Sequence, residues 1–459
     1  MRCMIGQVIT VISIDVLHDE VLLAIFDFYV DEAPIHAWQS LIHVCRRWRS
    51  VVFGSPCRLN LRLNCTSRTP TRDTLDVWPS LPIHIEDSDF VTQGLGNIVA
   101  ALERSDRVRQ IELWGLCSPM DEFLAATRAP FPELTDLLLE IYDENEAPVL
   151  PDSFLGGSTP RLKTLELERV SFPGLPKLLL SATYLVDLRL VEIPHSGYIS
   201  PEVMVTALST LTSLGSFKLE FESPRSHPRR PLPLRRTVLP ALVEVSFKGD
   251  SRYLEDFVAR IDAPQLTSLY IAFVDQIVSD PLQCIQFINR TPALKEFEKA
   301  AIVFGDLVRV NFSSQTSVLH MGIPCRRVPW QLLSLRRVFT SSLPHLSTSE
   351  DLFIYKKDMW LHTIDMPWLE LFRPFTAVKN LYLSEKVVRY IAFSLEGLVG
   401  DKTTEVFPIL QNIFLENIQL SRYDYEGIKR FAAARQATSH PVTVSHWDRD
   451  KMGCGEIDQ

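Results

Sequence analysis

The segment TPRLKTLELERVSFPGLPKLLLSATYLVDLRL, residues 159–190, contains the same apolar pattern twice and decides the fold of the chain. Leu162, Leu165 and Leu167 make up the first copy, and leucines at positions 185, 188 and 190 make up the second. The last two leucines of each copy are two positions apart, so they lie on one face of a short strand. Pro160 stands at the start of the first strand, where proline is tolerated. The pattern therefore predicts a run of short strands, each with one apolar face.

This pattern, apolar-x-x-apolar-x-apolar, recurs through most of the chain. Its seven tandem copies are Val108-Ile111-Leu113, Leu134-Leu137-Leu139, Leu162-Leu165-Leu167, Leu185-Leu188-Leu190, Leu214-Phe217-Leu219, Leu242-Val245-Phe247 and Leu266-Leu269-Ile271. Their first residues are 26, 28, 23, 29, 28 and 24 positions apart. These steps fall in or near the range of about 20–29 residues that is typical of leucine-rich repeats. Later matches are Val378-Leu381-Leu383 and Leu410-Ile413-Leu415, with partial matches before them at Leu294-Phe297 and Leu352-Phe353-Ile354.

Several segments between these strands have helical spacing, at residues 116–127, 203–211, 253–261 and 282–288. One strand and one helix cannot bury their own apolar faces, so neighbouring units must stack. We therefore predict an α/β fold with parallel strands inside an arc and helices outside it. The asparagine of regular repeats is missing, since Glu140 follows Leu139, so the chain resembles a degenerate leucine-rich-repeat solenoid.

A different pattern precedes the repeats, in LHDEVLLAIFDFYVDEAPIHAWQSLIHVCRRWRSVVF, residues 17–53. Apolar residues recur at helical spacing on both sides of Pro34, which predicts two or three short helices. Asp19 and Glu20 suit a helix start, because negative charge is favourable beside the exposed N–H groups there. A unit of this size buries little surface by itself, so we expect it to lean on a partner or on the neighbouring domain.

The same stretch resembles an F-box. The family pattern has a Leu-Pro opening, an acidic residue, an Ile-Phe pair and a Val-Cys-Arg-x-Trp run. This chain offers Leu17, Glu20, Ile25-Phe26, Val44-Cys45-Arg46 and Trp48, with His18 in place of the proline. Taken with the irregular repeats, the chain resembles the expanded F-box family of fungi.

The resemblance implies a substrate receptor that has no active site of its own. The helical unit would dock the Skp-type adaptor of a Skp-cullin-F-box ubiquitin ligase, and the solenoid would recruit a target protein. The residues expected to bind the adaptor are Leu17, Leu22, Ile25, Phe26, Leu41, Val44, Cys45 and Trp48. Two alternatives stay open, namely a helical hairpin packed on its own chain and a repeat scaffold that binds a protein partner without a ligase. The basic run Arg46, Arg47 and Arg49 is either a solvated helix face or a contact with an acidic adaptor surface.

Composition narrows the class of protein. The chain has 459 residues and a formal net charge of −9, which argues against nucleic-acid binding through bulk charge. No run approaches the roughly 18 consecutive apolar residues of a membrane span, so we expect no membrane partner. Gln7, Thr10 and Ser13 interrupt the apolar N-terminus and no cleavage site follows, so we expect no targeting role. The eight scattered cysteines form no C-x-x-C pair and predict reduced thiols in the cytoplasm or nucleus.

The sequence contains no strong catalytic or cofactor motif, and we expect neither an enzyme nor a bound cofactor or metal. Gly94-Leu95-Gly96 lacks the third glycine of a dinucleotide loop. His195 and Cys325 are isolated, and an isolated histidine or cysteine is more often structural than catalytic. The acidic pairs Asp121-Glu122 and Asp143-Glu144 have no partner that indicates acid–base work.

The predicted organisation has five parts. They are an N-terminal extension at 1–14, the F-box at 15–57, a connector with irregular units at 58–107, the solenoid at 108–445 and a disordered tail at 446–459. Within the connector we expect strands at 58–63 and 81–85, a loop at 66–73 and a helix at 98–102. A last helix at 428–434 and a last strand at 442–444 end the solenoid. The Arg/Pro-rich segment 223–237 is interpreted as a solvated insertion, with a nuclear-localisation or acidic-partner patch as the alternative, and the Trp-rich segment 311–375 is left as either an irregular flank or part of the target-binding surface.

Overall fold

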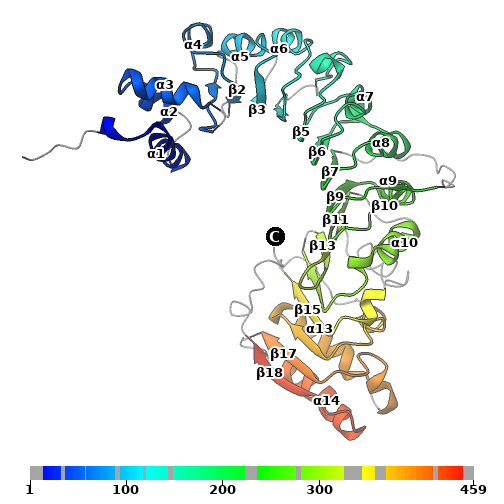
Figure 1. Cartoon of the computed structure of the whole chain (residues 1–459). Helices are drawn as coiled ribbons and strands as arrows, with labels where there is room; N and C mark the ends of the chain where they lie inside the picture. The colour runs from blue at the N-terminus through cyan, green and yellow to red at the C-terminus, as the bar shows by residue number, and fades with distance from the viewer. Residues whose placement is uncertain are drawn as a thin grey trace, which may run out of the picture.

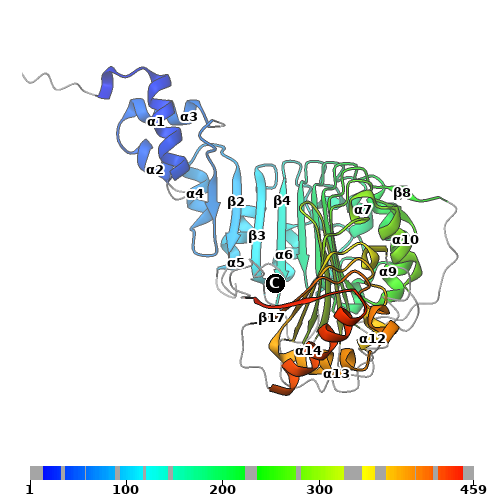
Figure 2. The same cartoon turned by 90° about the horizontal axis from the view of Figure 1, so that it is seen from below.

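One open sheet of 16 strands, mostly parallel, organises this mixed α/β protein. The computed structural model describes residues 14–32, 37–56, 58–87, 94–116, 120–142, 148–222, 235–274, 281–305, 307–324, 344–356, 368–398, 400–416 and 422–447. The sheet curves into an arc, with the strands along its inner side and the helices along its outer side (Figure 1). The N-terminal helices α1–α3 lie beyond the first strands, at one end of the arc (Figure 2).

The strands of the large sheet are hydrogen-bonded in the order β1-β2-β3-β4-β5-β6-β7-β9-β11-β14-β13-β12-β15-β16-β17-β18. Their bounds are β1 (Leu63–Cys65), β2 (Ile83–Asp87), β3 (Val108–Leu116), β4 (Asp136–Ile141), β5 (Thr164–Glu168), β6 (Asp187–Ile193), β7 (Ser216–Phe221), β9 (Glu244–Gly249), β11 (Ser268–Phe273), β12 (Lys299–Phe304), β13 (Leu307–Ser313), β14 (Val318–Pro324), β15 (Asp351–Lys356), β16 (Asn380–Leu383), β17 (Asn412–Glu416) and β18 (Thr443–Trp447). A separate parallel pair joins β8 (Thr237–Val238) to β10 (Ile261–Asp262).

The helices are α1 (Asp19–Glu32), α2 (Ala37–Ile42), α3 (Arg46–Gly54), α4 (Thr71–Val77), α5 (Leu95–Leu102), α6 (Asp121–Ala126), α7 (Leu175–Leu179), α8 (Pro201–Leu208), α9 (Ser251–Val258), α10 (Leu282–Arg290), α12 (Trp368–Phe372), α13 (Glu385–Glu396) and α14 (Arg422–Ala437). The predicted helices between the repeats are confirmed as α6, α8, α9 and α10. The predicted helices at 98–102 and 428–434 are confirmed within α5 and α14.

Alternation of apolar and polar residues builds each strand of the repeat region. In β5, Leu165 and Leu167 are buried and the residues on either side of them are half-exposed. Leu165 pairs in register with Leu137 of β4 and with Leu188 of β6, so neighbouring strands stack their apolar positions into one continuous core. The last two apolar residues of all seven tandem copies lie in such strands, β3 to β7, β9 and β11, and those of the later matches lie in β15, β16 and β17.

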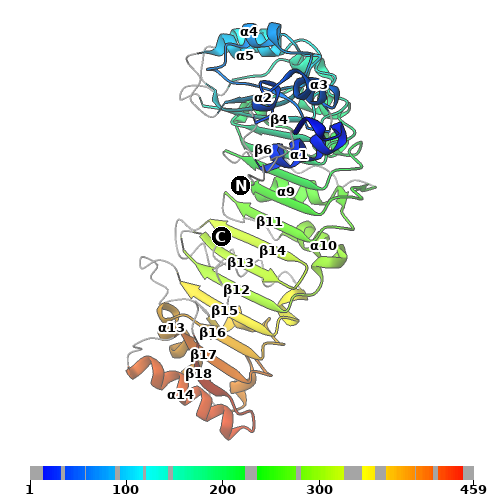
Figure 3. The same ribbon diagram turned by 60° about the vertical axis from the view of Figure 1, so that its left-hand side comes forward.

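The prediction of a wholly parallel sheet is wrong in the middle of the arc. The chain passes from β11 to β12, but β14 rather than β12 pairs with β11. β13 runs antiparallel to both β12 and β14, and it lies between them in Figure 3. Short connections join these three strands, which suits antiparallel neighbours, whereas parallel neighbours need a crossover. The partial match at Leu294–Phe297 is not a strand, since residues 292–294 form a 3₁₀ turn before β12.

The predictions for the connector are partly wrong. Residues 58–60 form turns and the first strand covers only Leu63–Cys65. Of the predicted strand at 81–85, residues 83–85 lie in β2 and residues 81–82 precede it. The predicted loop at 66–73 contains the start of α4, a short helix that buries only Thr71 and Leu75. Two buried positions are too few to produce a clear helical period, which explains the error.

Other predictions fall partly outside the described residues. These are the N-terminal extension as far as residue 13, residues 223–234 of the Arg/Pro-rich segment, residues 325–343 and 357–367 of the Trp-rich segment, and the tail from residue 448. The predicted start of the disordered tail at residue 446 is wrong, because residues 446 and 447 belong to β18. The predicted last strand at 442–444 is confirmed in β18, which begins at Thr443. The described parts of the Trp-rich segment contain β14 and β15, so it supplies strands to the sheet.

Candidate functional site

The three N-terminal helices, which we call the head (residues 14–56), begin as their sequence dictates. Asp19 and Glu20 occupy the first turn of α1, and the N–H groups of Val21 and Leu22 both bind the carbonyl oxygen of His18. The first turn therefore forms with His18 in place of the proline of the F-box pattern. Cys45 caps α3, because its Sγ accepts a hydrogen bond from the N–H of Trp48 at 3.4 Å. This contact gives Cys45 a structural role as the cap of α3.

The eight residues that the sequence predicts for adaptor binding do not lie at one surface. Ile25 and Val44 are 44% and 59% exposed, and Leu17, Cys45 and Trp48 are half-buried. Leu22, Phe26 and Leu41, which the resemblance assigns to adaptor binding, are at most 7% exposed. These three side chains fill the core of the head, where the Phe26 and Trp48 rings lie 4.7 Å apart.

The outward face of α1 carries exposed apolar residues that the motif comparison left out of the site. Val21, Phe28 and Tyr29 are 46%, 65% and 43% exposed, and they share this face with Ile25. The signal was present in the sequence, because positions 21, 25 and 28 have helical spacing. The docking candidate is therefore the outer stripe of α1, formed by Val21, Ile25, Phe28 and Tyr29, rather than all eight residues that the resemblance assigns to adaptor binding. Val44 is a further exposed apolar residue of the head.

In the basic run next to Cys45, two of the three arginines, Arg47 and Arg49, form hydrogen bonds within the head. Arg47 donates hydrogen bonds to the Leu17 carbonyl and to Asp19 Oδ1, the latter at 2.7 Å, so the start of α3 is tied to the start of α1. Arg49 Nε donates to the Ile42 carbonyl at 3.1 Å. Arg46 is exposed. The choice between a solvated face and an adaptor contact therefore concerns Arg46 most directly.

An aromatic contact joins the head to the arc. The buried Trp38 of α2 lies 5.5 Å, ring to ring, from Trp78, which follows α4. Phe53 and His43 also lie within 6.4 Å of the Trp78 ring. The head therefore buries one side against its own chain and leaves the outer stripe of α1 uncovered within the described residues.

The remaining sequence candidates have structural explanations or lie outside the described residues. Gly94 precedes α5 with a φ of +94°, and an added Cβ would stand 2.2 Å from the Ser67 carbonyl oxygen, so the backbone itself requires this glycine. His195 is exposed in a 3₁₀ turn, and Asp121-Glu122 form the first turn of α6. Cys325 and Asp143-Glu144 lie outside the described residues.

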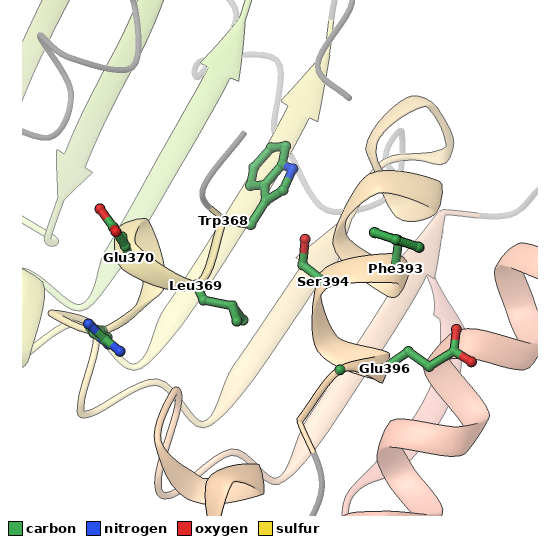
Figure 4. Close-up of a pocket in the computed structure, with 8 residues that line it drawn as sticks. Trp368, Leu369, Glu370, Phe393, Ser394 and Glu396 are labelled. Carbon is green, nitrogen blue, oxygen red and sulfur yellow. The ribbon is translucent and has the colours of Figure 1, made fainter. Parts of the chain in front are cut away.

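A hollow of about 730 Å³ lies between α12 and α13 (Figure 4). Its lining includes Phe393, which is 80% exposed, and Trp368, which is buried against Phe304 and Phe372. The polar side chains at its rim are engaged elsewhere: the Ser394 hydroxyl donates to the Tyr390 carbonyl, Arg373 binds Glu405 and Arg430 binds Glu396. These contacts give the hollow no pair of groups set up for acid–base or nucleophilic chemistry.

Within the described part of the chain, no helix has both the length and the apolar composition needed to cross a bilayer. No protein-family model matches the chain, and no curated protein matches it.

Proposed function

We propose that this protein is an F-box substrate receptor of a Skp-cullin-F-box ubiquitin ligase. The head docks a Skp-type adaptor and, through it, a cullin scaffold, while a leucine-rich-repeat-like solenoid recruits a target protein. The receptor contributes proximity between the target and the ubiquitin donor and performs no chemistry itself. It acts in the cytoplasm or the nucleus, where this machinery works.

The observation that carries the proposal is the uncovered outer stripe of α1. Four apolar side chains, Val21, Ile25, Phe28 and Tyr29, are each 43–65% exposed on one face of one helix. Contiguous apolar surface rimmed by polar residues marks interaction sites on soluble proteins. A helix that presents such a stripe fits an apolar partner surface, which is how the F-box resemblance has the head bind its adaptor.

The arc supports the second half of the proposal. Its strands lie along the inner side of the arc and its helices along the outer side (Figure 1), and alternate residues of β4, β5 and β7 are half-exposed. Stacked repeats that curve in this way create extended concave surfaces suited to protein partners.

The test is capture of a purified Skp-type adaptor by the full chain, measured by biolayer interferometry. The variant Ile25→Ser with Phe28→Ser removes two exposed side chains and is expected to weaken binding at least about tenfold. The matched control, Tyr184→Ser with Phe393→Ser, removes two side chains that are 65% and 80% exposed on the arc and is expected to leave binding unchanged. Equal weakening by both variants, or no capture by the unmodified chain, would contradict the proposal.

One observation favours the alternative of a repeat scaffold without a ligase. Leu22, Phe26 and Leu41 are buried in the core of the head, so the head completes part of its hydrophobic burial alone. On that alternative, the outer stripe of α1 binds some other protein, and the unmodified chain captures no Skp-type adaptor in the same assay.

A further inference from the structure

The inner side of the arc carries an excess of negative charge over its first half. In β4, β5 and β7, buried core residues alternate with half-exposed residues that face inward, and the residues of β2, β3 and β6 that pair in register with these inward positions face the same way. The inward-facing carboxylates, which we call the acidic inner face, are Glu86, Glu112, Asp136, Glu140, Glu166, Glu168, Asp187 and Glu220. Counted the same way, the inward cations of these strands are Arg189 and Lys218.

These cations are shared among carboxylates rather than matched to them. Arg189 lies 3.0 Å from Asp187 and 3.8 Å from Glu166, and Lys218 lies 3.2 Å from Glu220. Arg169, at the end of β5, binds Glu192 at 2.7 Å and also lies 3.5 Å from Glu140. Neighbouring carboxylates therefore remain close to one another without one cation each.

The carboxylates are also partly withdrawn from water. The side chains of Glu140, Glu166 and Glu168 are only 19–22% exposed. Burial raises the pKa of Glu166 and of Glu168, and nearby acidic groups raise both further. A partner that brings positive charge to this face would relieve both effects.

A second observation at the same face is the state of His84. This inward residue of β2 is 5% exposed, and its ring Nδ1 forms no hydrogen bond within the described residues. Its Nε2 lies 3.5 Å from Glu112 Oε1, so the ring is directed at the acidic inner face. Burial lowers the pKa of His84, so the ring supplies no positive charge there near neutral pH.

The dimensions of the face fit a polypeptide rather than a small cation. Six adjacent strands about 4.8 Å apart extend over roughly 24 Å, the length of about seven residues of an extended chain. Trp114 and Tyr142, at the ends of β3 and β4, are 37% and 42% exposed. Such rings can stack on guanidinium groups, and Arg169 already lies 5.7 Å from the Tyr142 ring centre.

We propose that the acidic inner face of β2 to β7 binds an extended segment of a target protein that is rich in lysine and arginine. This deepens the proposed function by naming its class of target, and it rests on that function only for the fate of the target, not for the binding itself.

The test uses the full chain and fluorescence anisotropy of a labelled peptide of about 12 residues in which Lys and Arg alternate with Ser. The variant Glu112→Gln, Glu140→Gln, Glu168→Gln is expected to weaken binding at least about tenfold. The control variant Glu103→Gln, Glu122→Gln, Glu202→Gln changes net charge equally at exposed positions on the outer helices and is expected to change binding less than about twofold. The single variant Glu112→Gln, at a side chain that is 36% exposed, is expected to weaken binding about threefold and guards against misfolding of the triple variant.

Three results would overturn the inference: no binding of the basic peptide, equal weakening by the inner and outer triple variants, or displacement of the peptide by free spermine as effectively as by unlabelled peptide. Each would show that the face does not select a basic polypeptide. Adaptor capture is measured separately, so loss of peptide binding with adaptor capture intact rejects this inference alone. Loss of adaptor capture with peptide binding intact rejects the ligase proposal alone.

Discussion

Arg435 of α14 is the most informative single residue for the stability of the arc. Its side chain is fully buried, and its hydrogen bonds go to backbone carbonyl oxygens. Nη1 donates to the carbonyl oxygens of Thr403 and Phe407 at 3.0 and 3.2 Å, and Nη2 donates to those of Pro408 and Leu410 at 3.3 and 3.2 Å. This guanidinium therefore ties α14 to the turns that precede β17. Burial lowers its pKa, as expected for a cation held only by neutral acceptors.

The substitution Arg435→Met keeps much of the apolar volume and removes all four hydrogen bonds to these carbonyl oxygens. The Phe407 carbonyl still accepts the Leu410 N–H, so three carbonyls lose the Arg435 donor; at about 1–3 kcal/mol for each, the gross loss is about 3–9 kcal/mol. The opposing gain is relief from burying an unpaired cation, which is of the order of a few kcal/mol. We expect a net loss of about 3 kcal/mol, concentrated in α14, β17 and β18, because units of a stacked array unfold locally.

Urea unfolding followed by circular dichroism gives the size of the loss, and amide hydrogen exchange gives its place. The matched control is Arg430→Met on the same helix, since that side chain is 64% exposed and its ion pair with Glu396 contributes at most about 1 kcal/mol. Arg435→Met should speed exchange in α14 and β17 while β3 to β7 keep their protection. The reasoning is refuted if both variants lose the same stability, or if exchange rises evenly along the arc.

Two further predictions test local features of the first half of the arc. Gly94→Ala is expected to lower the free energy of unfolding in urea by about 2–4 kcal/mol, because Gly94 has a positive φ and lies close to the Ser67 carbonyl. The control Gly96→Ala is expected to be close to neutral, because the space around Gly96 is open. Similar effects of both variants would contradict the steric explanation. Burial raises the folded pKa values of Glu166 and Glu168, so the stability that these groups contribute at low pH is lost as pH rises through those values. The double Gln variant is therefore expected to have a higher Tm than the unmodified chain near pH 7, and the difference in Tm is expected to be smaller near about pH 4. A margin that does not depend on pH would reject this account.

The repeat strands could be predicted because apolar and polar residues alternate in them. The central strand β12 could not, because it lacks this alternation. β4 and β5 bury every second residue, which leaves a clear trace in the sequence. β12 buries all its residues except Lys299, because both of its faces are covered. A strand covered on both faces reads as a continuous apolar run with no period, so neither its direction nor its neighbour can be inferred locally. In the sheet, β14 rather than β12 pairs with β11. This pairing depends on contacts between distant segments, so the sequence of one segment cannot predict it.

The candidate site was predictable as a helix but not as a surface. Helical spacing correctly placed Leu22, Ile25 and Phe26 on α1, yet it cannot say which of two adjacent apolar stripes turns inward. That choice follows from tertiary contacts, such as Phe26 against Trp48 and the tie between Arg47 and Asp19. An apolar stripe wider than the core requires is the sequence trace of a second, outward-facing surface.

The inward positions of the two halves of the arc carry side chains of opposite character, apolar in β12 and β15 to β18 and acidic in β2 to β7. Inward positions of β12 and β15 to β18 carry an aromatic and aliphatic cluster whose main members, such as Phe353 and Tyr382, are at most 6% exposed. The rings of Phe353, Tyr382 and Phe414 stack across three adjacent strands at 4.2 and 4.6 Å, so cross-strand contacts stabilise this half directly. In β2 to β7 the equivalent positions carry carboxylates, which neither stack nor match their cations one for one. Charge held there contributes little to folding and some of it opposes folding, so its physical role is best explained by a partner that supplies the missing cations.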